Sequence, residues 1–458
     1  MNIPQSLHFV GIGGVGMSAI AQVCHRGGFV VQGSDLQNSP SVFRLQNQGI
    51  RVHIGHAAEH LDGAEALVVS TAVHSDNPEI QEAIRKGLPI FHRSEVLAHL
   101  MKCHRSVAVT GTHGKTTTTG MIASILIGAG FDPTVLAGGD LPRLGSNARA
   151  GQSPFLVAEA DESDRSLTRL TAEWVIVTNL EADHLDHYKD LDDIVKTVAG
   201  FINSLPDHAQ VIACADDPGV RLLLPMLQRR AHTYGFTEGE HRIYSETLAA
   251  NGSSFLLDGE AFEVGAAGRH NILNAAASVL TARLMGAKAE ALKAPLKEFN
   301  GMGRRFDHQG TFAGVSIFTD YAHHPTEIRA TIQTARLHKR PVWVVFQPHR
   351  YSRTSALLNE FSKCFEGANA IAIMDVYSAG ETPNGVTSLD LIERLRAQNP
   401  DVPVHYWPTH KDAEGGLDLL LKPGDMLLLL GAGNINALAH PLLERLKLRE
   451  VILSSASA

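Results

Sequence analysis

A phosphate-binding loop is the chemistry that the sequence indicates most directly. Residues 108–119 read AVTGTHGKTTTT, which predicts a short apolar strand, a turn bounded by glycines, and a helix that opens with a lysine. Backbone N–H groups and the positive end of the helix dipole favour an anion at such a turn. The loop is shorter than the full P-loop pattern, whose first glycine would fall at Val109. The residues expected to contact nucleotide phosphates are Gly111, Thr112, His113, Gly114, Lys115, Thr116 and Thr117.

A metal site is expected beside this loop. Lys115 is predicted to reach the β- and γ-phosphates, and Thr116 to place its hydroxyl on Mg²⁺. Glu159 ends the apolar strand FLVAE, where the acid of a Walker B strand would lie, and is predicted as a metal ligand. His184 follows another apolar strand and is a candidate for a second ion, although imidazole suits Mn²⁺ better than Mg²⁺. The alternative for His184 is a loop histidine held by hydrogen bonds.

A second glycine-rich turn follows the first strand of the chain. Gly11, Gly13 and Gly16 have the spacing of a dinucleotide fingerprint, and Asp35 lies where the ribose-binding acid would be. The pattern alone is weak, because a tight turn with packing glycines has the same spacing. It predicts only that a phosphate or pyrophosphate can approach a helix N-terminus there.

Charged clusters lie in and beyond a glycine-rich linker, predicted over residues 298–310. Arg304 and Arg305 fall in that linker, where a cation could neutralise a transferring phosphoryl group. Two clusters, 320–325 (DYAHHP) and 347–351 (QPHRY), each follow an apolar strand. Ligand-binding loops lie at the carboxyl ends of parallel strands, so both clusters are predicted to contact ligands. An arginine there can bind a carboxylate with two parallel hydrogen bonds.

Composition limits the class of protein. The chain has 458 residues, 44% of them hydrophobic and 19% charged, enough for about three folded domains. A net charge of −8 argues against a nucleic-acid partner, which would need a basic face. No apolar run approaches the roughly 20 residues of a membrane helix. The four cysteines are scattered, and the N-terminus lacks a signal-peptide pattern, so we expect a cytoplasmic protein.

Strand and helix signals alternate in three stretches, predicted as domains over residues 1–103, 104–307 and 308–458. The repeated βαβ pattern predicts parallel sheets. We therefore expect an α/β protein with an N-terminal Rossmann-like parallel sheet, a central P-loop ATPase-like domain and a C-terminal Rossmann-like domain. The turn signals NG at 251–252 and DG at 258–259 predict a small antiparallel meander in the middle stretch.

Ten short segments, taken in order, resemble the Mur ligases of bacterial cell-wall synthesis. They are HFVGIGGVGMS, STAVHSDNPE, GTHGKTTTT, AEADESD, VTNLEADHLD, GRHNILNAAA, GMGRRFD, DYAHHPTE, FQPHRYSRT and LLGAGNI. The resemblance runs nearly end to end. It implies an ATP-dependent ligase that joins L-alanine to the carboxylate of UDP-N-acetylmuramate through an acyl phosphate. It also implies that the domains bind the UDP-sugar, ATP and the amino acid in that order.

The same resemblance implies roles for individual residues. It makes the first glycine loop a site for the diphosphate of a UDP-sugar instead of NAD. The implied substrate-binding residues are Gly13, Gly14, Asp35, Ser70, Thr71, His74, Arg350 and Tyr351. The implied ATP contacts beyond the phosphate loop are Asn271, Asn274, Asp320 and Tyr321. The implied catalytic residues are Lys115, Arg305, His323 and His349, and the implied metal ligands are Thr116, Glu159 and His184.

One residue departs from the family pattern. Ala322 lies in DYAHHP, where alanine-adding ligases commonly have glycine, and alanine is seen in a related muropeptide-recycling ligase that attaches a whole tripeptide. FQPHRYSRT fits the alanine-adding type, which is therefore favoured, and the tripeptide ligase stays an alternative. Two other classes remain: an NAD-dependent dehydrogenase built on the first glycine turn, and a non-catalytic nucleotide-binding regulator.

Overall fold

The computed structural model describes residues 3–184 and 187–456, with side chains through residue 452. Leu185 and Asp186, part of the predicted polar cluster around His184, lie outside the described residues, as do the outermost ends of the first and third predicted domains. The chain divides into two compact units. Unit one comprises Met1–Ser245, Phe255–Phe262 and Leu273–Phe299, and unit two comprises Glu246–Ser254, Glu263–Ile272 and Asn300–Ala458.

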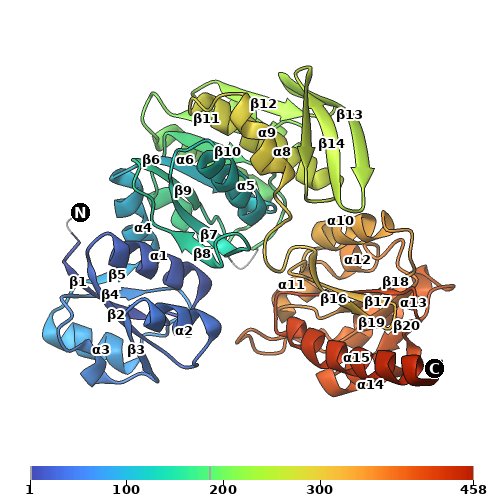
Figure 1. Ribbon diagram of the computed structural model, residues 1–458. Helices are drawn as coiled ribbons and strands as arrows, with labels where there is room; N and C mark the ends of the chain where they lie inside the picture. Colours follow the sequence, from blue (N-terminus) through green and yellow to red (C-terminus); the bar gives the residue numbers. More distant parts are fainter. Residues whose placement is uncertain (1–2, 185–186, 457–458) are drawn as a thin grey trace. The chain divides into compact units, whose positions relative to one another are not determined.

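The first sheet is parallel, as the βαβ pattern predicts (Figure 1). Its order is β3-β2-β1-β4-β5, which places the first strand at the centre. The strands are β1 (Ser6–Val10), β2 (Val30–Asp35), β3 (Arg51–Ile54), β4 (Ala66–Val69) and β5 (Ile90–His92), and the helices are α1 (Val15–Arg26), α2 (Pro40–Asn47), α3 (Pro78–Lys86) and α4 (Arg93–Lys102). Because β1 is buried on both faces, its residues Leu7, Phe9 and Val10 are all apolar.

The second sheet has ten strands in the order β15-β14-β13-β12-β11-β10-β6-β9-β7-β8. The strand that leads into the phosphate loop, β6 (Arg105–Thr110), runs parallel to both of its neighbours, β9 (Phe155–Glu159) and β10 (Trp174–Val177). The other strands are β7 (Thr134–Leu141), β8 (Ser146–Arg149), β11 (Gln210–Cys214), β12 (Ala231–Gly235), β13 (His241–Ala249), β14 (Gly252–Leu257) and β15 (Glu260–Val264). The two-residue turns between β13, β14 and β15 form the meander that the sequence predicts.

The helices of the second sheet include α5 (Lys115–Gly128), which starts at the phosphate loop, and α8 (Arg269–Leu284). The others are α6 (Leu191–Ser204), α7 (Pro218–Leu223) and α9 (Glu290–Lys297). The first two sheets share one core in unit one, which runs from Phe9 and Ile20 to Ala158 and Val175. Polar contacts also join them, since Asn147 Nδ2 donates to the carbonyl of Val15 at 2.7 Å. The first predicted domain and most of the second therefore fold against each other within one compact unit, while Glu246–Ser254 and Glu263–Ile272 of the second belong to unit two.

The third sheet lies in unit two and has the order β16-β17-β21-β18-β19-β20. Its first two strands pair antiparallel and the rest pair parallel. The strands are β16 (Asp307–Phe312), β17 (Val315–Asp320), β18 (Val342–Phe346), β19 (Ala370–Ile373), β20 (Val404–Tyr406) and β21 (Met426–Leu430), and the helices are α10 (Pro325–Arg336), α11 (Tyr351–Ala356), α12 (Leu358–Phe361), α13 (Ser388–Gln398), α14 (His410–Leu420) and α15 (Ala439–Ala456). The predicted linker over 298–310 is shorter than expected, because its last residues pair with β17.

The α/β class predicted from the sequence is confirmed in all three sheets. Among the described residues, none of the helices is both long and apolar enough to cross a membrane.

Candidate active site

The phosphate loop joins β6 to α5, as its sequence predicts. Gly111 has φ 127° and Gly114 has φ 83°, both in the left-handed region that favours glycine. A Cβ on Gly111 would lie 2.2 Å from Oγ1 of Thr178, and one on Gly114 would lie 2.7 Å from Oδ1 of Asn274. Both glycines are therefore required for the close packing of the loop as well as for its conformation.

The loop that follows β10 holds the phosphate loop in place. The side chain of Asn179 accepts the His113 N–H at 2.7 Å and donates to the His113 carbonyl at 2.9 Å. The hydroxyl of Thr178 donates to the same carbonyl at 2.7 Å. Sequence reasoning did not single out Thr178 or Asn179, although they follow the strand WVIV directly, at the ligand-binding edge of a parallel sheet. Their contacts fix the backbone whose N–H groups are expected to bind phosphate.

The Lys115 ammonium is half-buried beside this loop. Its Nζ donates to the carbonyls of Gly111 at 2.6 Å and Thr112 at 3.2 Å, and lies 2.8 Å from Oε1 of Glu162. Burial opposes the charge, but the carboxylates of Glu162 and Asp161 outweigh it and raise the pKa of Lys115. The ammonium is therefore positively charged at neutral pH and lies where a nucleotide phosphate is expected.

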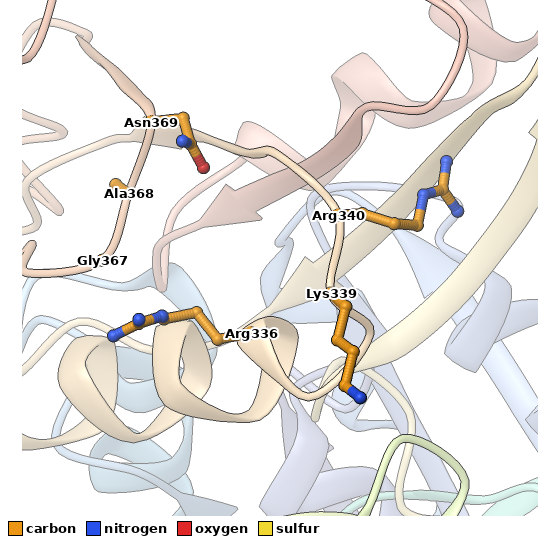
Figure 2. A pocket seen from close by; sticks show the side chains of 6 residues that line it. All are labelled: Arg336, Lys339, Arg340, Gly367, Ala368 and Asn369. Atoms are coloured by element: carbon orange, nitrogen blue, oxygen red, sulfur yellow. The ribbon is translucent and has the colours of Figure 1, made fainter.

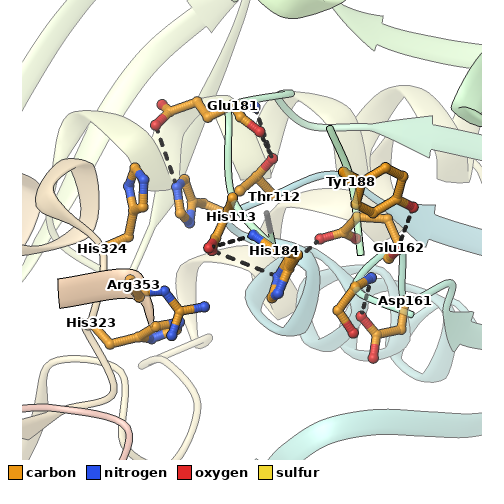
Figure 3. Close-up of polar contacts among 12 residues, drawn as sticks. Thr112, His113, Asp161, Glu162, Glu181, His184, Tyr188, His323, His324 and Arg353 are labelled. Atoms are coloured by element: carbon orange, nitrogen blue, oxygen red, sulfur yellow. Dashed lines mark hydrogen bonds and ion pairs between the residues drawn. The ribbon is translucent and has the colours of Figure 1, made fainter. Parts of the chain in front are cut away.

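Glu162 is a functional candidate that sequence reasoning missed. Its side chain is 2% exposed, and burial raises its pKa to about 7, against the opposing effect of Lys115. Figure 3 shows it close to His184 and Tyr188, with the Tyr188 hydroxyl donating to the Glu162 carbonyl at 2.5 Å. The signal that could have found it is the acid run ADESD directly after β9. A buried carboxyl with a raised pKa beside a lysine is typical of a functional site.

The predicted metal ligands Thr116 and Glu159 lie together. A Cβ on Gly138 would come within 2.7 Å of Oε2 of Glu159 and 3.0 Å of Oγ1 of Thr116, so only glycine leaves room beside both oxygens. The Gly138 N–H donates to the other oxygen of Glu159. These hard oxygen donors fit Mg²⁺. Burial raises the pKa of Glu159, and a bound cation would favour its ionised form.

The third predicted metal residue, His184, lies in a different position. Its Nε2 is 3.9 Å from Oε1 of Glu162 and 3.6 Å from Oδ2 of Asp183, and its backbone φ is 53°. His184 therefore lies against the carboxylate that also binds Lys115. The structure brings His184 to the acidic edge of the loop, which is compatible with a role in binding a second ion.

The first glycine loop is held by Asp35. The Gly13 N–H donates to Oδ2 of Asp35 at 2.8 Å, and a Cβ on Gly13 would lie 2.8 Å from that oxygen. Oδ1 of Asp35 accepts the Gln37 N–H at 3.1 Å. Asp35 was considered as a ligand for a ribose hydroxyl, and in this structure it binds the backbone of the loop. Gly14 caps the N-terminus of α1, where a diphosphate is expected to bind.

Ser70, Thr71 and His74 lie in the loop that follows β4, the strand next to β1. Thr71 and His74 are exposed and Ser70 is half-buried. The carboxyl ends of parallel neighbours share one edge of the sheet, so this loop lies on the same edge as the first glycine loop. Among the implied ATP contacts, Asn274 lies against Gly114, and the Nδ2 of Asn271 donates to the Ala267 carbonyl at 2.7 Å.

In unit two, the predicted residues Arg305, Asp320 and Tyr321 gather at the carboxyl end of β17. Arg305 lies 3.3 Å from Oε1 of Glu327, and its guanidinium is 5.3 Å from the centre of the Tyr321 ring. Asp320 accepts the N–H groups of Phe306 and Ala322, both at 2.8 Å. Burial raises the pKa of Asp320 to about 6, against the opposing effect of Arg305.

The predicted residues His323, His349, Arg350 and Tyr351 lie at the carboxyl ends of β17 and β18, which flank β21. The rings of His323 and His349 are 6.1 Å apart. Nδ1 of His323 lies 2.9 Å from the Tyr321 carbonyl, so it carries the proton in that hydrogen bond. Arg350 caps α11, whose first residue is Tyr351, with a φ of 68°. The structure thus brings two imidazoles and an arginine together, as the two strand-end clusters predict.

His349 is expected to stay neutral through the physiological pH range. Burial, with Arg353 and Arg350 nearby, lowers its pKa to about 4. The ring signals of His349 in labelled protein, assigned with His349→Asn, should then show no titration between pH 8 and about 5.5. Because an unfolded histidine titrates near 6.5, the stability from neutral His349 is complete above that pH and is lost as the pH falls towards 4. A midpoint near 6.5 in the folded protein would contradict this.

A pocket of about 480 Å³ lies on unit two, and its lining includes none of the residues of these clusters. Figure 2 shows its lining, which includes Arg336, Lys339 and Arg340. Arg340 donates to the carbonyls of Gly424 and Gly314, both at 2.7 Å. Its guanidinium joins strand connections of the third sheet, so it has a structural role.

Comparison with known proteins places these sites in a family. Residues 6–105 match the Mur ligase family, catalytic domain, residues 109–282 match the Mur ligase middle domain, and residues 304–433 match the Mur ligase, glutamate ligase domain. The chain belongs to the Mur ligase family. The resemblance predicted from the ten sequence segments is therefore confirmed, and this Mur ligase is an enzyme of the ligase class.

Individual relatives of this Mur ligase cover nearly its whole length. A UDP-N-acetylmuramate–L-alanine ligase of Solibacter usitatus is 45% identical over 97% of this chain and 96% of its own. A ligase of the same name from Geotalea uraniireducens is 42% identical over 97% of this chain and 98% of its own. The crystal structure of a UDP-N-acetylmuramate–alanine ligase from Thermotoga maritima has a TM-score of 0.83 at 27% identity, covering 96% of this chain and 98% of its own.

Proposed function

We propose that this Mur ligase joins L-alanine to the carboxylate of UDP-N-acetylmuramate at the expense of ATP, in peptidoglycan synthesis in the cytoplasm. The observation that carries the proposal is the phosphate loop, where a half-buried Lys115 lies beside a threonine–glutamate pair suited to Mg²⁺. Two relatives with 45% and 42% identity carry the name of this activity. The proposed domains are residues 1–103 for the UDP-sugar, 104–307 for ATP and 308–458 for the amino acid.

The proposed reaction has two steps. The muramate carboxylate attacks the γ-phosphorus of ATP, which forms an acyl phosphate and releases ADP. The amine of L-alanine then attacks the acyl carbon, an amide forms and inorganic phosphate leaves. Lys115 and Arg305 would stabilise the charge that develops on the transferred phosphoryl group. Mg²⁺ held by Thr116 and Glu159, with His184 serving a second ion such as Mn²⁺, would add further positive charge.

The remaining predicted residues would bind and orient the substrates. We propose that the loop at Gly13 and Gly14, at the N-terminus of α1, binds the sugar-nucleotide diphosphate, with Ser70, Thr71 and His74 along the same edge. Asn271, Asn274, Asp320 and Tyr321 would contact ATP. Arg350 and Tyr351 would bind L-alanine, and one of the imidazoles of His323 and His349 would accept the proton of its amine.

Phosphate release tests the proposal and its main alternative. Wild-type protein receives ATP, Mg²⁺ and UDP-N-acetylmuramate, with either L-alanine or the tripeptide L-Ala-γ-D-Glu-meso-diaminopimelate. We expect phosphate release with L-alanine only. Release with the tripeptide only would identify a muropeptide-recycling ligase and make Ala322 the informative residue. Absence of release with both would contradict the proposed function.

A further inference from the structure

A fully buried carboxylate, Glu79, contacts the end of β2 at Ser34 and has no role in the proposed reaction. Glu79 is in the first turn of α3, where Asn77 caps the helix by accepting the Glu79 N–H at 2.9 Å. Its side chain is 0% exposed, as is that of His8 on β1. A buried charge is strongly unfavourable unless it is paired and hydrogen-bonded, so the partners of Glu79 must account for its position.

Three histidines and a serine surround this carboxylate. Oε1 lies 2.9 Å from Nδ1 of His60 and 3.6 Å from Nε2 of His8. Oε2 lies 3.1 Å from Nδ1 of His56 and accepts the hydroxyl of Ser34 at 2.6 Å. Both oxygens thus have donors from separate elements of the first sheet. Burial opposes the charge, but the nearby His8 ring and the hydrogen bonds from Ser34 and His60 outweigh it and lower the pKa of Glu79 to about 2.

Ser34 connects the carboxylate to the glycine loop. The backbone carbonyl of Ser34 accepts the N–H of Gly11 at 2.8 Å and the N–H of Ile12 at 2.9 Å. The next residue, Asp35, accepts the Gly13 N–H at 2.8 Å. The end of β2 therefore fixes three consecutive N–H groups of the loop. The Ser34 hydroxyl is held to α3 by its hydrogen bond to Glu79, and it also lies 3.0 Å from Nδ1 of His56, which itself contacts Glu79.

From this chain of contacts we infer that Glu79 is a positioning residue for sugar-nucleotide binding. It holds the Ser34 hydroxyl, and Ser34 holds the backbone of the loop that receives the diphosphate. The inference rests on the proposed function, because it assumes that the first glycine loop binds the diphosphate of UDP-N-acetylmuramate. A positioning role differs from a general structural role in one respect. Replacing Glu79 should weaken the binding of UDP-N-acetylmuramate and of no other substrate.

The test compares Glu79→Gln, Ser34→Ala and the double variant with wild type. Glutamine keeps the size of the side chain and removes the charge that both His60 and Ser34 contact. A hydrogen bond to a charged group is worth enough to change binding about tenfold or more. We expect the KM and the calorimetric dissociation constant for UDP-N-acetylmuramate to rise about tenfold, with kcat and the KM for ATP within about twofold.

The double variant shows whether Glu79 and Ser34 affect substrate binding through one chain of contacts or independently. If Glu79 acts through Ser34, the double variant should bind UDP-N-acetylmuramate about as weakly as Glu79→Gln alone, because the effects are not additive. If the fold-loss of affinity in the double variant equals the product of the losses in the two single variants, the inference is overturned. Glu82→Gln is the matched control. Glu82 lies on the same helix as Glu79, three residues later, and pairs with the exposed Arg85. This control variant should bind like wild type.

The outcomes also distinguish this inference from the proposed function. Wild-type protein that does not bind UDP-N-acetylmuramate would contradict the proposed function itself. Wild-type binding together with unchanged binding by Glu79→Gln would overturn the inference alone, as would an equal loss of kcat and of affinity for every substrate. If Glu79→Gln does not fold, Ser34→Ala decides the question, because normal binding by a folded Ser34→Ala protein overturns the inference.

Discussion

Replacing Lys115 with methionine is expected to slow phosphate release by about 10²- to 10³-fold, the loss that follows removal of one group that stabilises a transition state. Methionine retains the unbranched apolar stem and removes the ammonium. That ammonium lies beside the phosphate loop, 14% exposed, where a charge interacts more strongly than in water. Steady-state phosphate release with saturating ATP, UDP-N-acetylmuramate and L-alanine measures the effect on kcat.

Lys102→Met provides the control for this experiment. Lys102 ends α4 on the surface of the same unit, so its loss should leave kcat within about twofold. Lys115→Met should still bind UDP-N-acetylmuramate with near wild-type affinity, because the first glycine loop does not depend on the ammonium. If Lys115→Met turns over at the wild-type rate, the phosphate loop is not the site of phosphoryl transfer.

The variant Gly111→Ala is expected to lose nucleotide binding and about 2–4 kcal/mol of stability. Two effects add here. The φ of 127° is strained for any residue with a Cβ, and that Cβ would lie 2.2 Å from Oγ1 of Thr178 and 2.8 Å from the Asn179 carbonyl. The loop after β10 would have to move, and with it the contacts that hold His113. Urea unfolding measures the stability, and calorimetric titration with a non-hydrolysable ATP analogue measures binding.

Gly130→Ala separates the clash from the backbone strain. Gly130 has φ 80°, and a Cβ there would meet nothing within 4 Å. It should cost only about 1–2 kcal/mol, the penalty for a left-handed alanine, and nucleotide binding should be unchanged. Normal ATP-analogue binding by Gly111→Ala would show that the close packing of the loop against Thr178 is not needed for the site.

Local patterns in the sequence were sufficient to predict the loops that carry the chemistry. The phosphate loop between β6 and α5 and the glycine loop between β1 and α1 are each encoded by adjacent residues: an apolar strand, glycines and a helix start. The strand-end clusters around His323 and His349 were predictable for the same reason, because ligand-binding edges follow from parallel topology. The two imidazoles lie on loops after β17 and β18, which are separated in the sheet by β21, the last of its strands along the chain, and only the structure reveals their proximity.

Contacts between distant segments could not be predicted in this way. Glu162 is one acid among several in ADESD, and its pairing with Lys115 depends on how β9 packs beside β6. Glu79 reads as a first-turn helix acid, whose burial depends on histidines from β1 and from the chain after β3. The role of Asp35 was ambiguous for a different reason: a carboxylate at that position can bind a ribose hydroxyl or a backbone N–H with equal chemical suitability.

The common core of the first two sheets bears on how Mur ligases can exchange parts. Transplanting residues 1–103 from a relative would bring a new α1 against the resident β7 and β8, where Asn147 binds the backbone at Val15 and Arg44 pairs with Asp140. An exchange of the first sheet therefore also requires the facing surface of the second. A junction near residue 299 would leave that seam intact, and it would separate Glu246–Ser254 and Glu263–Ile272 from the rest of unit two.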